Sequence, residues 1–323
     1  MTKEDLRIVF MGTPEFAVAT LQALLDHHYH VVGVVTQPDK AVGRHASVLQ
    51  PPPVKQFALE HGLPVLQPEK MKDPVFLDQL RAWQANLQVV VAFRMLPEVV
   101  WAMPRYGTFN VHAALLPDYR GAAPINWAVI NGETETGVTT FFLDHQIDTG
   151  RIIRKKPFHI PDDADVAYVY EGLMHLGAEL CIDTLSDIVA ADGFPPSAPQ
   201  DSRLALHAAP KLCKENCRID WQQGSKQVYD FVRGLSPVPG AWTMLVADDG
   251  VETMLKVYQT TKLSQEAPPC LAPGMLTRDK KHLYVMCADG LLQIDSLQLA
   301  GKKRMDAASF LNGLGMIEKY SLK

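Results

Sequence analysis

Three polar side chains that could carry out acyl-transfer chemistry lie within residues 110–150. They are an amide, an imidazole and a carboxylate, Asn110, His112 and Asp148, called the polar trio below. Asn110 and His112 are two positions apart in strand-like sequence, so both side chains would point to the same face. An amide N–H and an imidazolium can stabilise a developing oxyanion, and a carboxylate can accept a proton directly or through water. The stretch therefore predicts an acyl-transfer site that needs no metal.

The carboxylate of the trio follows a second apolar run, Val138–Leu143. An Ile-Asp-Thr-Gly turn at this place could bring the side chain of Asp148 back toward His112. Each residue alone has an ordinary structural interpretation: the Asn forms a turn, the His is exposed or satisfied, and the Asp caps a turn. Their occurrence together, with a Gly/Ala/Pro-rich turn between them, favours catalysis.

The apolar pattern before this stretch predicts the α/β framework that would hold it. Leu6–Met11 and Val31–Val35 read as buried strands, Phe16–Leu25 as the helix between them, and Leu87–Ala92 as a central strand. The trio would then lie at a strand end, where an open α/β sheet has its ligand crevice. The first turn lacks a G-x-G-x-x-G motif and no acidic residue ends the second strand, so we expect no nicotinamide cofactor.

A different pattern begins after residue 210. Short strands separated by Gly, Pro and Asp, with one helix before them and one after, predict a small open barrel of the OB type. Basic residues accompany the strands without an aromatic ladder, which favours contact with the phosphates of a folded RNA over reading of its bases. The predicted strands are Ala241–Val246, Thr253–Thr260, Gly274–Leu276, His282–Cys287 and Leu291–Leu299, and the helices are Ser225–Leu235 and Asp306–Leu311.

The trio and several other segments resemble the methionyl-tRNA formyltransferases, a family among the enzymes that use 10-formyltetrahydrofolate. The resemblance spans nearly the whole chain. The chain departs from the family at Ala114, where Ser is usual, at Asp118, where a basic or polar residue is common, and at His145–Ile147, where a Gly-Leu pair often precedes the Asp. The segments that match are Gly12–Ala17, Asn110, His112, Leu115–Pro117, Tyr119–Pro124, Gly137–Thr139, Asp148–Gly150 and Gly301–Met305.

The resemblance implies formyl transfer from 10-formyltetrahydrofolate, as co-substrate, to the α-amino group of methionine on initiator methionyl-tRNA. Asn110 and His112 would stabilise the oxyanion, while Asp148 would keep the imidazole charged and help remove the proton. No metal is implied. The implied folate-binding residues are Phe93, Arg94, Met95, Leu96, Ala114, Leu115, Leu116 and Pro117. The implied tRNA-binding residues are Lys40, Arg44, Lys302, Lys303 and Arg304.

Two basic stretches and one acidic pair have a structural and a functional interpretation. The segment from Thr36 to Pro53 has no clear period and reads as a long loop, which either grips the tRNA acceptor end, as in the family, or is a plain surface loop. The basic run from Arg151 to Lys156 is either a solvated strand edge or a phosphate contact. Asp162 and Asp163 predict the cap of a long amphipathic helix.

Composition and charge suggest two domains of different character. The chain of 323 residues is 47% hydrophobic and 21% charged, as in ordinary soluble proteins. Up to residue 207, 16 basic and 24 acidic residues give a net charge of −8, whereas 15 and 12 give +3 from residue 208 onward. We predict a Rossmann-like formyltransferase domain over 1–191, a Pro-rich linker over 192–210 and an OB-like tRNA-binding domain over 211–323.

The remaining expectations concern location and partners. The charged N-terminus and the lack of an apolar run near 18 residues predict a cytoplasmic protein that does not bind membranes. Five scattered cysteines argue against a disulfide framework. The expected partners are initiator methionyl-tRNA and folate, with no DNA. The alternatives are another formyl-folate enzyme (a purine-pathway or sugar-nucleotide formyltransferase, or a formyl-folate hydrolase) and a non-enzymatic RNA-binding protein.

Overall fold

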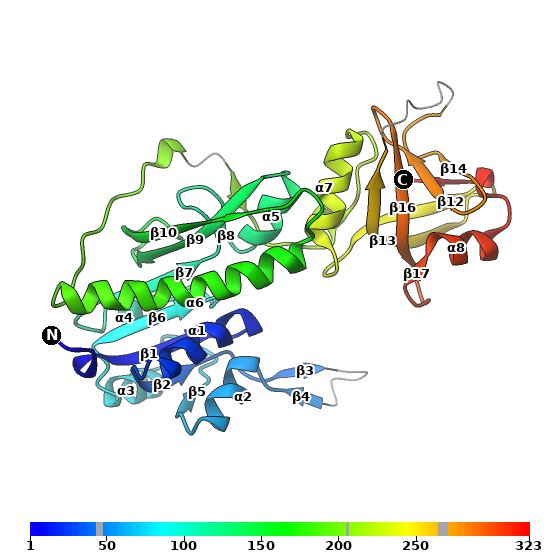
Figure 1. Ribbon diagram of the computed structural model, residues 1–323. Coiled ribbons are helices and arrows are strands. Elements are labelled where there is room, and N and C mark those ends of the chain that lie inside the picture. The colour runs from blue at the N-terminus through cyan, green and yellow to red at the C-terminus, as the bar shows by residue number, and fades with distance from the viewer. Residues whose placement is uncertain (43–47, 205–206, 264–270) are drawn as a thin grey trace. The chain divides into compact units, whose positions relative to one another are not determined.

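The computed structural model describes residues 1–42, 48–204, 207–263 and 271–323. The chain forms two compact units (Figure 1). The first contains residues 1–121, 135–159 and 170–208, and the second contains 122–134, 160–169 and 209–323. Two early segments, 122–134 and 160–169, thus belong to the same unit as the C-terminal strands. No helix in the described residues is long and apolar enough to cross a membrane.

The first unit is built on a seven-stranded sheet in the order β10-β9-β7-β6-β1-β2-β5. Neighbouring strands from β7 to β5 run parallel, and β9 and β10 are antiparallel additions at one edge. This arrangement confirms the predicted Rossmann-like α/β class. The strands are β1 (Arg7–Gly12), β2 (His30–Val35), β5 (Val65–Leu66), β6 (Leu87–Val91), β7 (Thr108–His112), β9 (Glu135–Phe142) and β10 (Ile152–His159).

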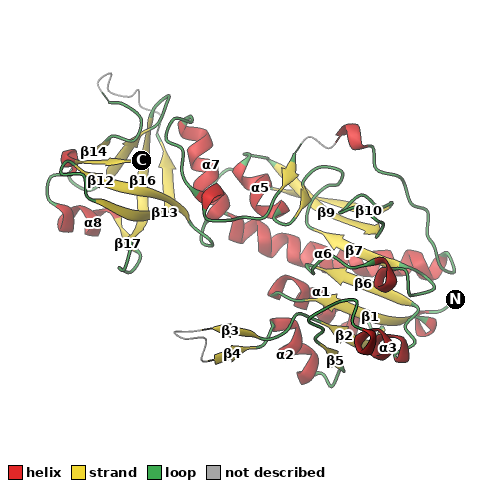
Figure 2. Ribbon diagram, turned by 180° about the vertical axis from the view of Figure 1, so that it is seen from behind, coloured by secondary structure: helices red, strands yellow, loops and turns green. Residues whose placement is uncertain are grey.

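Helices cover the sheet (Figure 2), so its central strands are largely buried. Every residue of β6 is buried, including Gln88, whose side-chain oxygen accepts a hydrogen bond of 2.9 Å from Thr108. Gly177 lets the long helix α6 approach the sheet, since a methyl group there would lie 3.3 Å from Val111. The helices of this unit are α1 (Glu15–Asp26), α2 (Pro53–Glu60), α3 (Pro74–Ala82), α4 (Glu98–Trp101) and most of α6 (Val166–Ala190).

Two local expectations for the first half of the chain were wrong. The predicted loop between residues 36 and 53 contains an antiparallel ribbon, β3 (Lys40–Val42) with β4 (Val48–Gln50). The predicted cap of α6 was also wrong. The helix begins later than expected, and the backbone N–H of Tyr168 donates to Asp165 at 3.0 Å. Asp162 instead pairs with Lys262 and takes no part in the cap.

The second unit contains the antiparallel barrel, with strands in the order β14-β15-β16-β13-β12-β18. A bridge between Met275 and Ser321 brings the first and last of these strands together, so the sheet nearly closes. The predicted OB-like class is confirmed, but two strands were missed. The strands are β12 (Ala241–Ala247), β13 (Glu252–Lys262), β14 (Leu276–Arg278), β15 (Leu283–Met286), β16 (Leu291–Leu299), β17 (Met305–Asp306), which pairs with β16, and β18 (Tyr320–Leu322).

Helices of the second unit pack beside the barrel strands. They are α5 (Pro124–Ile130), α7 (Ser225–Leu235) and α8 (Ala307–Leu314). Gly234 allows α5 and α7 to approach closely, because a methyl group there would come within 2.6 Å of the Ile130 side chain. Arg233, nearly buried, donates to Asp230 at 2.8 Å and to the carbonyl of Ala164 at 2.7 Å. The segment before α6 is thereby tied to α7.

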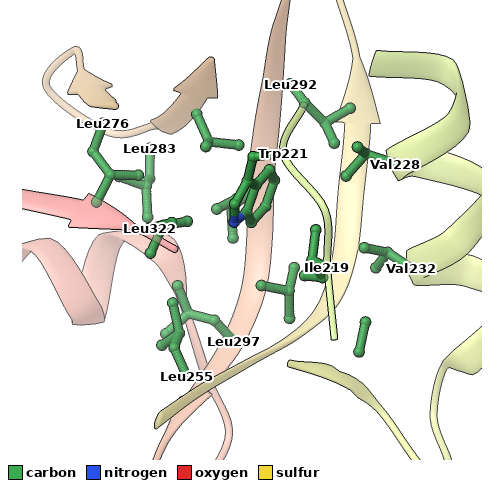
Figure 3. Close-up of a cluster of buried hydrophobic side chains, with 14 of the residues drawn as sticks. Ile219, Trp221, Val228, Val232, Leu255, Leu276, Leu283, Leu292, Leu297 and Leu322 are labelled. Carbon is green, nitrogen blue, oxygen red and sulfur yellow. The ribbon is translucent and has the colours of Figure 1, made fainter. Parts of the chain in front are cut away.

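The barrel core surrounds the indole of Trp221 (Figure 3). Its ring lies among leucines from several strands, while its Nε1–H donates to Thr243 at 3.0 Å. The hydroxyl of Thr243 in turn donates to the carbonyl of Lys323 at 2.8 Å. The one polar atom of the indole is therefore satisfied inside an apolar core, as a buried Trp requires.

We predict that Leu255→Ala, in this core, lowers the free energy of unfolding by about 2–5 kcal/mol, because it removes buried methyl groups and leaves a cavity. Leu255 is 1% exposed. The matched control is Val251→Ala, on the adjoining turn, where the side chain is 59% exposed and the expected change is within about 0.5 kcal/mol. Urea unfolding followed by circular dichroism measures both. Equal losses in the two variants would contradict the placement of Leu255 in the core.

Candidate active site

Asn110 and His112 lie at the carboxyl end of β7, on one face of the strand. Asn110 pairs with Phe141 and His112 with Thr139 of the antiparallel neighbour β9. The intervening Val111 is 2% exposed on the opposite face. Asn110 is half-buried, and across the described residues no other group hydrogen-bonds its side-chain amide. An amide donor is therefore available toward the carboxyl end of the strand.

The imidazole of His112 is buried and has its two nitrogens in different roles. Nε2 lies 3.0 Å from the carbonyl oxygen of Tyr119, and a carbonyl can only accept, so Nε2 carries a proton. Nδ1 lies 3.8 Å from Oδ2 of Asp148, which is longer than a hydrogen bond. The ring of Phe141 lies edge-on to the imidazole at 6.4 Å. Nδ1 is therefore the nitrogen left to face both the carboxylate and a ligand.

Asp148 is held by its turn and by a backbone donor. Its Oδ2 accepts from the N–H of Gly121 at 2.9 Å, and its φ of 55° is in the left-handed region. Such a conformation is uncommon outside glycine and persists where the surroundings determine it. Gly150 completes the turn, since a methyl group there would lie 1.7 Å from the Phe142 carbonyl oxygen. The structure thus places Asp148 near His112, which shares one face of β7 with Asn110.

The predicted folate-binding segment at residues 114–117 is hydrogen-bonded to Thr139 of β9. Thr139 donates to the carbonyl of Ala114 at 2.6 Å and accepts from the N–H of Leu116 at 3.1 Å. The ammonium of Lys155 also donates to the carbonyl of Leu116, and burial lowers the pKa of that lysine. Ala114 and Leu116 are fully buried, whereas Leu115 is half-buried. The side chain of Leu115 is therefore the part of residues 114–116 available to a ligand.

The predicted folate-binding segment at residues 93–96 turns at the carboxyl end of β6. Arg94 fixes the turn by donating to the carbonyls of Glu69, at 2.9 Å, and Pro68, and burial lowers the pKa of its guanidinium. Met95 is 76% exposed, while Leu96 packs into the core. Phe93 is half-buried beside the guanidinium of Arg94. The exposed Met95 and part of Phe93 are the side chains available to a ligand here.

The predicted tRNA-binding residues lie in different surroundings. Lys40 is exposed on β3, and Arg44 lies outside the described residues. Lys302 and Lys303 are exposed after β16. Arg304 donates to Ser296 at 2.7 Å, and its guanidinium lies 4.5 Å from the centre of the Tyr258 ring. The cations of the barrel are therefore partly organised by an aromatic side chain.

A second group of cations on the barrel was missed in the sequence. Lys214 and Arg218 lie 5.4 and 5.5 Å from the centre of the Trp242 ring. Trp242 stands directly opposite Lys256 in the β12–β13 pair. These residues are far apart in the sequence and follow no period, so only the pairing of strands reveals them.

The basic run from Arg151 to Lys156 has protein partners, which favours the structural interpretation over a phosphate contact. Arg151 donates to Ser197 at 3.0 Å, and Arg154 pairs with Asp187. Lys156 pairs with Glu179 at 2.6 Å, and Lys155 donates to the carbonyl of Leu116. Lys55, near the β3–β4 ribbon, is likewise paired at 2.7 Å with Asp39. Ion pairs of this kind reduce the charge that these side chains offer to a ligand.

Sequence reasoning also missed residues that position the trio. The predicted linker is docked, because Gln200 donates at 2.8 Å to the carbonyls of both Asp148 and Gly150. Asp118, noted as a departure from the family pattern, accepts from the backbone N–H of His207 at 2.6 Å and from its Nδ1 at 3.0 Å. The Pro- and Ser-rich composition of the segment does not reveal these hydrogen bonds.

Comparison with known families and proteins gives full-length matches. A family model described as formyl transferase matches residues 6–185, and one described as formyl transferase, C-terminal domain, matches residues 211–315. The methionyl-tRNA formyltransferase of Parabacteroides distasonis is 57% identical over 327 residues and is covered fully, as is this chain. That of Bacteroides fragilis is 54% identical, with 100% of this chain and 99% of the relative covered.

Solved structures share the fold at low identity. The sugar 3N-formyl transferase WlaRD, determined with dTDP and 5-N-formyl-THF, has a TM-score of 0.64 and 17% identity, covering 92% of this chain and 99% of that one. HypX from Aquifex aeolicus, in complex with tetrahydrofolic acid, has a TM-score of 0.62 and 18% identity, covering 95% of this chain and 47% of HypX. These two likenesses bear on the fold alone.

We predict that Gly150→Ala lowers the free energy of unfolding by at least about 2 kcal/mol, since its methyl group would overlap a backbone oxygen that cannot move without disturbing β9. The control is Gly313→Ala on α8, where no atom lies within 4 Å and the expected effect is a gain of up to about 1 kcal/mol. Denaturant unfolding of both variants tests this. A Gly150→Ala protein as stable as the wild type would rule out this geometry for the Asp148 turn.

Proposed function

This chain belongs to the methionyl-tRNA formyltransferase family and transfers a formyl group from a folate-derived donor to methionyl-tRNA, and we propose how its residues divide that work. The donor is 10-formyltetrahydrofolate, and the acceptor is the α-amino group of methionine on initiator tRNA. The observation that carries the proposal is that Asn110 and His112 share one face of β7, with Asp148 3.8 Å from His112. No step requires a metal.

The amine of the aminoacyl-tRNA is the nucleophile. A free α-amino group has a pKa of about 7.7–8.0, so a usable fraction is neutral near physiological pH. Its nitrogen attacks the formyl carbon, and the carbonyl electrons move onto oxygen to give a tetrahedral oxyanion. Collapse of this intermediate breaks the bond from the formyl carbon to N10 of the folate, which takes up a proton as it leaves. Holding both substrates in line supplies much of the rate.

Asn110 and His112 stabilise the oxyanion in this proposal. The Nε2–H of His112 is engaged by the Tyr119 carbonyl, so hydrogen bonding to the oxyanion falls to Nδ1. Because Nε2 already carries a proton, Nδ1 donates only when the ring is an imidazolium. The Asp148 carboxylate, 3.8 Å away, is the proposed counter-ion of that imidazolium. At 3.8 Å the carboxylate makes no hydrogen bond with Nδ1, which leaves the N–H of that nitrogen for the oxyanion.

Asp148 also removes the proton that the attacking amine loses, directly or through one water. The Gly121 N–H occupies Oδ2 and leaves Oδ1 as the oxygen for this transfer. Folate binds beside the trio against Leu115 and the turn at residues 93–96. Residues 1–191 provide this chemistry, and residues 211–323 bind the body of the tRNA, with 192–210 between them.

RNA binding by the C-terminal residues rests on exposed cations. Lys302 and Lys303 provide point charges for phosphates, and Lys40 on the β3–β4 ribbon adds a contact near the acceptor end. Arg304, stacked on Tyr258, presents a fixed guanidinium. Initiator tRNA and folate are thus the proposed partners, without DNA or membrane, and translation initiation places the reaction in the cytoplasm. Identity over the full length, including the C-terminal region, disfavours the other formyl-folate enzymes and a non-enzymatic RNA-binding role.

We predict that Asn110→Ala, His112→Ala and Asp148→Ala each lower kcat by about 100-fold or more, the scale of losing one oxyanion-type donor or its partner. Single-turnover formylation of charged initiator tRNA is the measurement. His159→Ala, at the exposed end of β10, is the control and should leave the rate unchanged. A trio variant that formylates near the wild-type rate would remove that residue from the mechanism.

We predict that the double variant Lys302→Ala/Lys303→Ala binds charged tRNA more weakly and with less dependence on salt. Each phosphate contact adds roughly 0.7–0.9 to the slope of log affinity against log salt concentration, so the slope should fall by about twice that amount. The KM for the formyl donor should stay the same. Lys70→Ala/Lys72→Ala, exposed before α3, is the matched control. An unchanged slope in the first variant would exclude these lysines from tRNA binding.

A further inference from the structure

The side chain of Gln200 connects two parts of the proposed active site. Its Nε2 donates to the carbonyl oxygens of Asp148 and Gly150, both at 2.8 Å. Its Oε1 accepts from Nε and Nη2 of Arg120, at 3.1 and 2.7 Å. An amide group has two N–H donors and two lone pairs on oxygen, so this side chain uses its entire hydrogen-bonding capacity.

These contacts act on the turn that carries the proposed proton acceptor. Asp148 has a left-handed backbone conformation that must be held by its surroundings. Gln200 holds the carbonyls of the turn, while the N–H of Gly121 holds the carboxylate at 2.9 Å. Arg120, which anchors Gln200, is the residue directly before Gly121. One dipeptide therefore fixes both the backbone and the carboxylate of Asp148, and Gln200 is the link to the backbone.

The segment that carries Gln200 is docked by other contacts as well. Ala198 and Ile152 exchange two backbone hydrogen bonds of 2.8 Å, and Arg151 donates to the hydroxyl of Ser197 at 3.0 Å. These contacts remain if the Gln200 side chain is changed. Loss of the amide should therefore release the Asp148 turn without releasing the segment, so its effect would be local to the site.

We propose that Gln200 is a positioning residue for formyl transfer, which holds Asp148 with its carboxylate facing Nδ1 of His112. The inference rests on the proposed role of Asp148. Gln200 acts through the backbone of the turn, so it should influence the chemical step through Asp148 alone.

Two variants separate the contacts of this amide. Gln200→Met keeps the length of the side chain and removes all four hydrogen bonds. Gln200→Glu keeps an acceptor for Arg120. It places a carboxylate oxygen, which cannot donate, opposite the carbonyls of Asp148 and Gly150. Both should lower kcat roughly 10- to 100-fold, as small misplacements of catalytic groups do, with the KM for 10-formyltetrahydrofolate within about twofold. Ser197→Ala, which removes a contact of the same segment away from Asp148, is the matched control and should keep wild-type kcat.

The decisive measurement is a double-mutant cycle on the full chain by single-turnover formylation. Gln200→Met should reduce the rate in the wild-type background, but by less than about twofold when Asp148→Asn is already present, because residues that act as a unit are not additive. Thermal melting of each variant accompanies the rates. Should Gln200→Met fail to fold, the same cycle with Gln200→Glu carries the test.

Three results would overturn the inference. One is wild-type kcat in both Gln200 variants while Asp148→Asn is impaired, which would leave the role of Asp148 standing. Another is an equal loss from Gln200→Met in both backgrounds, which would mean that Gln200 acts by some other route. The third is wild-type activity of Asp148→Asn itself, which would remove the proposed function of Asp148 together with this inference.

Discussion

The backbone of residues 118–121 is the constraint on which the rest of the active site depends. The carbonyl of Tyr119 fixes one nitrogen of His112, and the N–H of Gly121 fixes one oxygen of Asp148. Tyr119 is itself left-handed, with a φ of 56°. Two of the proposed catalytic side chains, one on a strand and one in a turn, are thus oriented by neighbouring peptide groups. Preorganised dipoles of this kind need no rearrangement during the reaction.

That short stretch is in turn held from outside by Gln200 and His207. Tyr119 donates its N–H to the carbonyl of His207 at 2.9 Å, and Asp118 accepts from the backbone and ring of His207. The segment that was predicted to be a linker therefore also helps to hold residues 118–121 in place. Its prolines limit the unfolded conformations and its polar side chains make the bonds. The same residues can connect two regions of the chain and also hold the candidate site residues of one region in place.

How much of this could be predicted depends on whether a local period exists. The alternation of β7 put Asn110 and His112 on one face, and the buried run of β6 identified a central strand. Gln200 and His207 have no such signal, since a polar residue in a Pro-rich segment has the same local sequence whether it is solvated or docked. The short strand β18 was missed for a related reason. Three residues cannot display a period, and its place is set by pairing with β12 at long range.

The charge count illustrates the same limit in electrostatics. The sequence shows a difference between −8 and +3, but a net charge does not say which cations face a ligand. Arg154, Lys156 and Lys55 are paired with carboxylates, and Lys155 serves a backbone carbonyl. Lys302 and Lys303, by contrast, have no ion pair with any described residue. Because a phosphate binds an individual cation and not the average, the net charge of a region does not identify which of its lysines and arginines are available to a ligand.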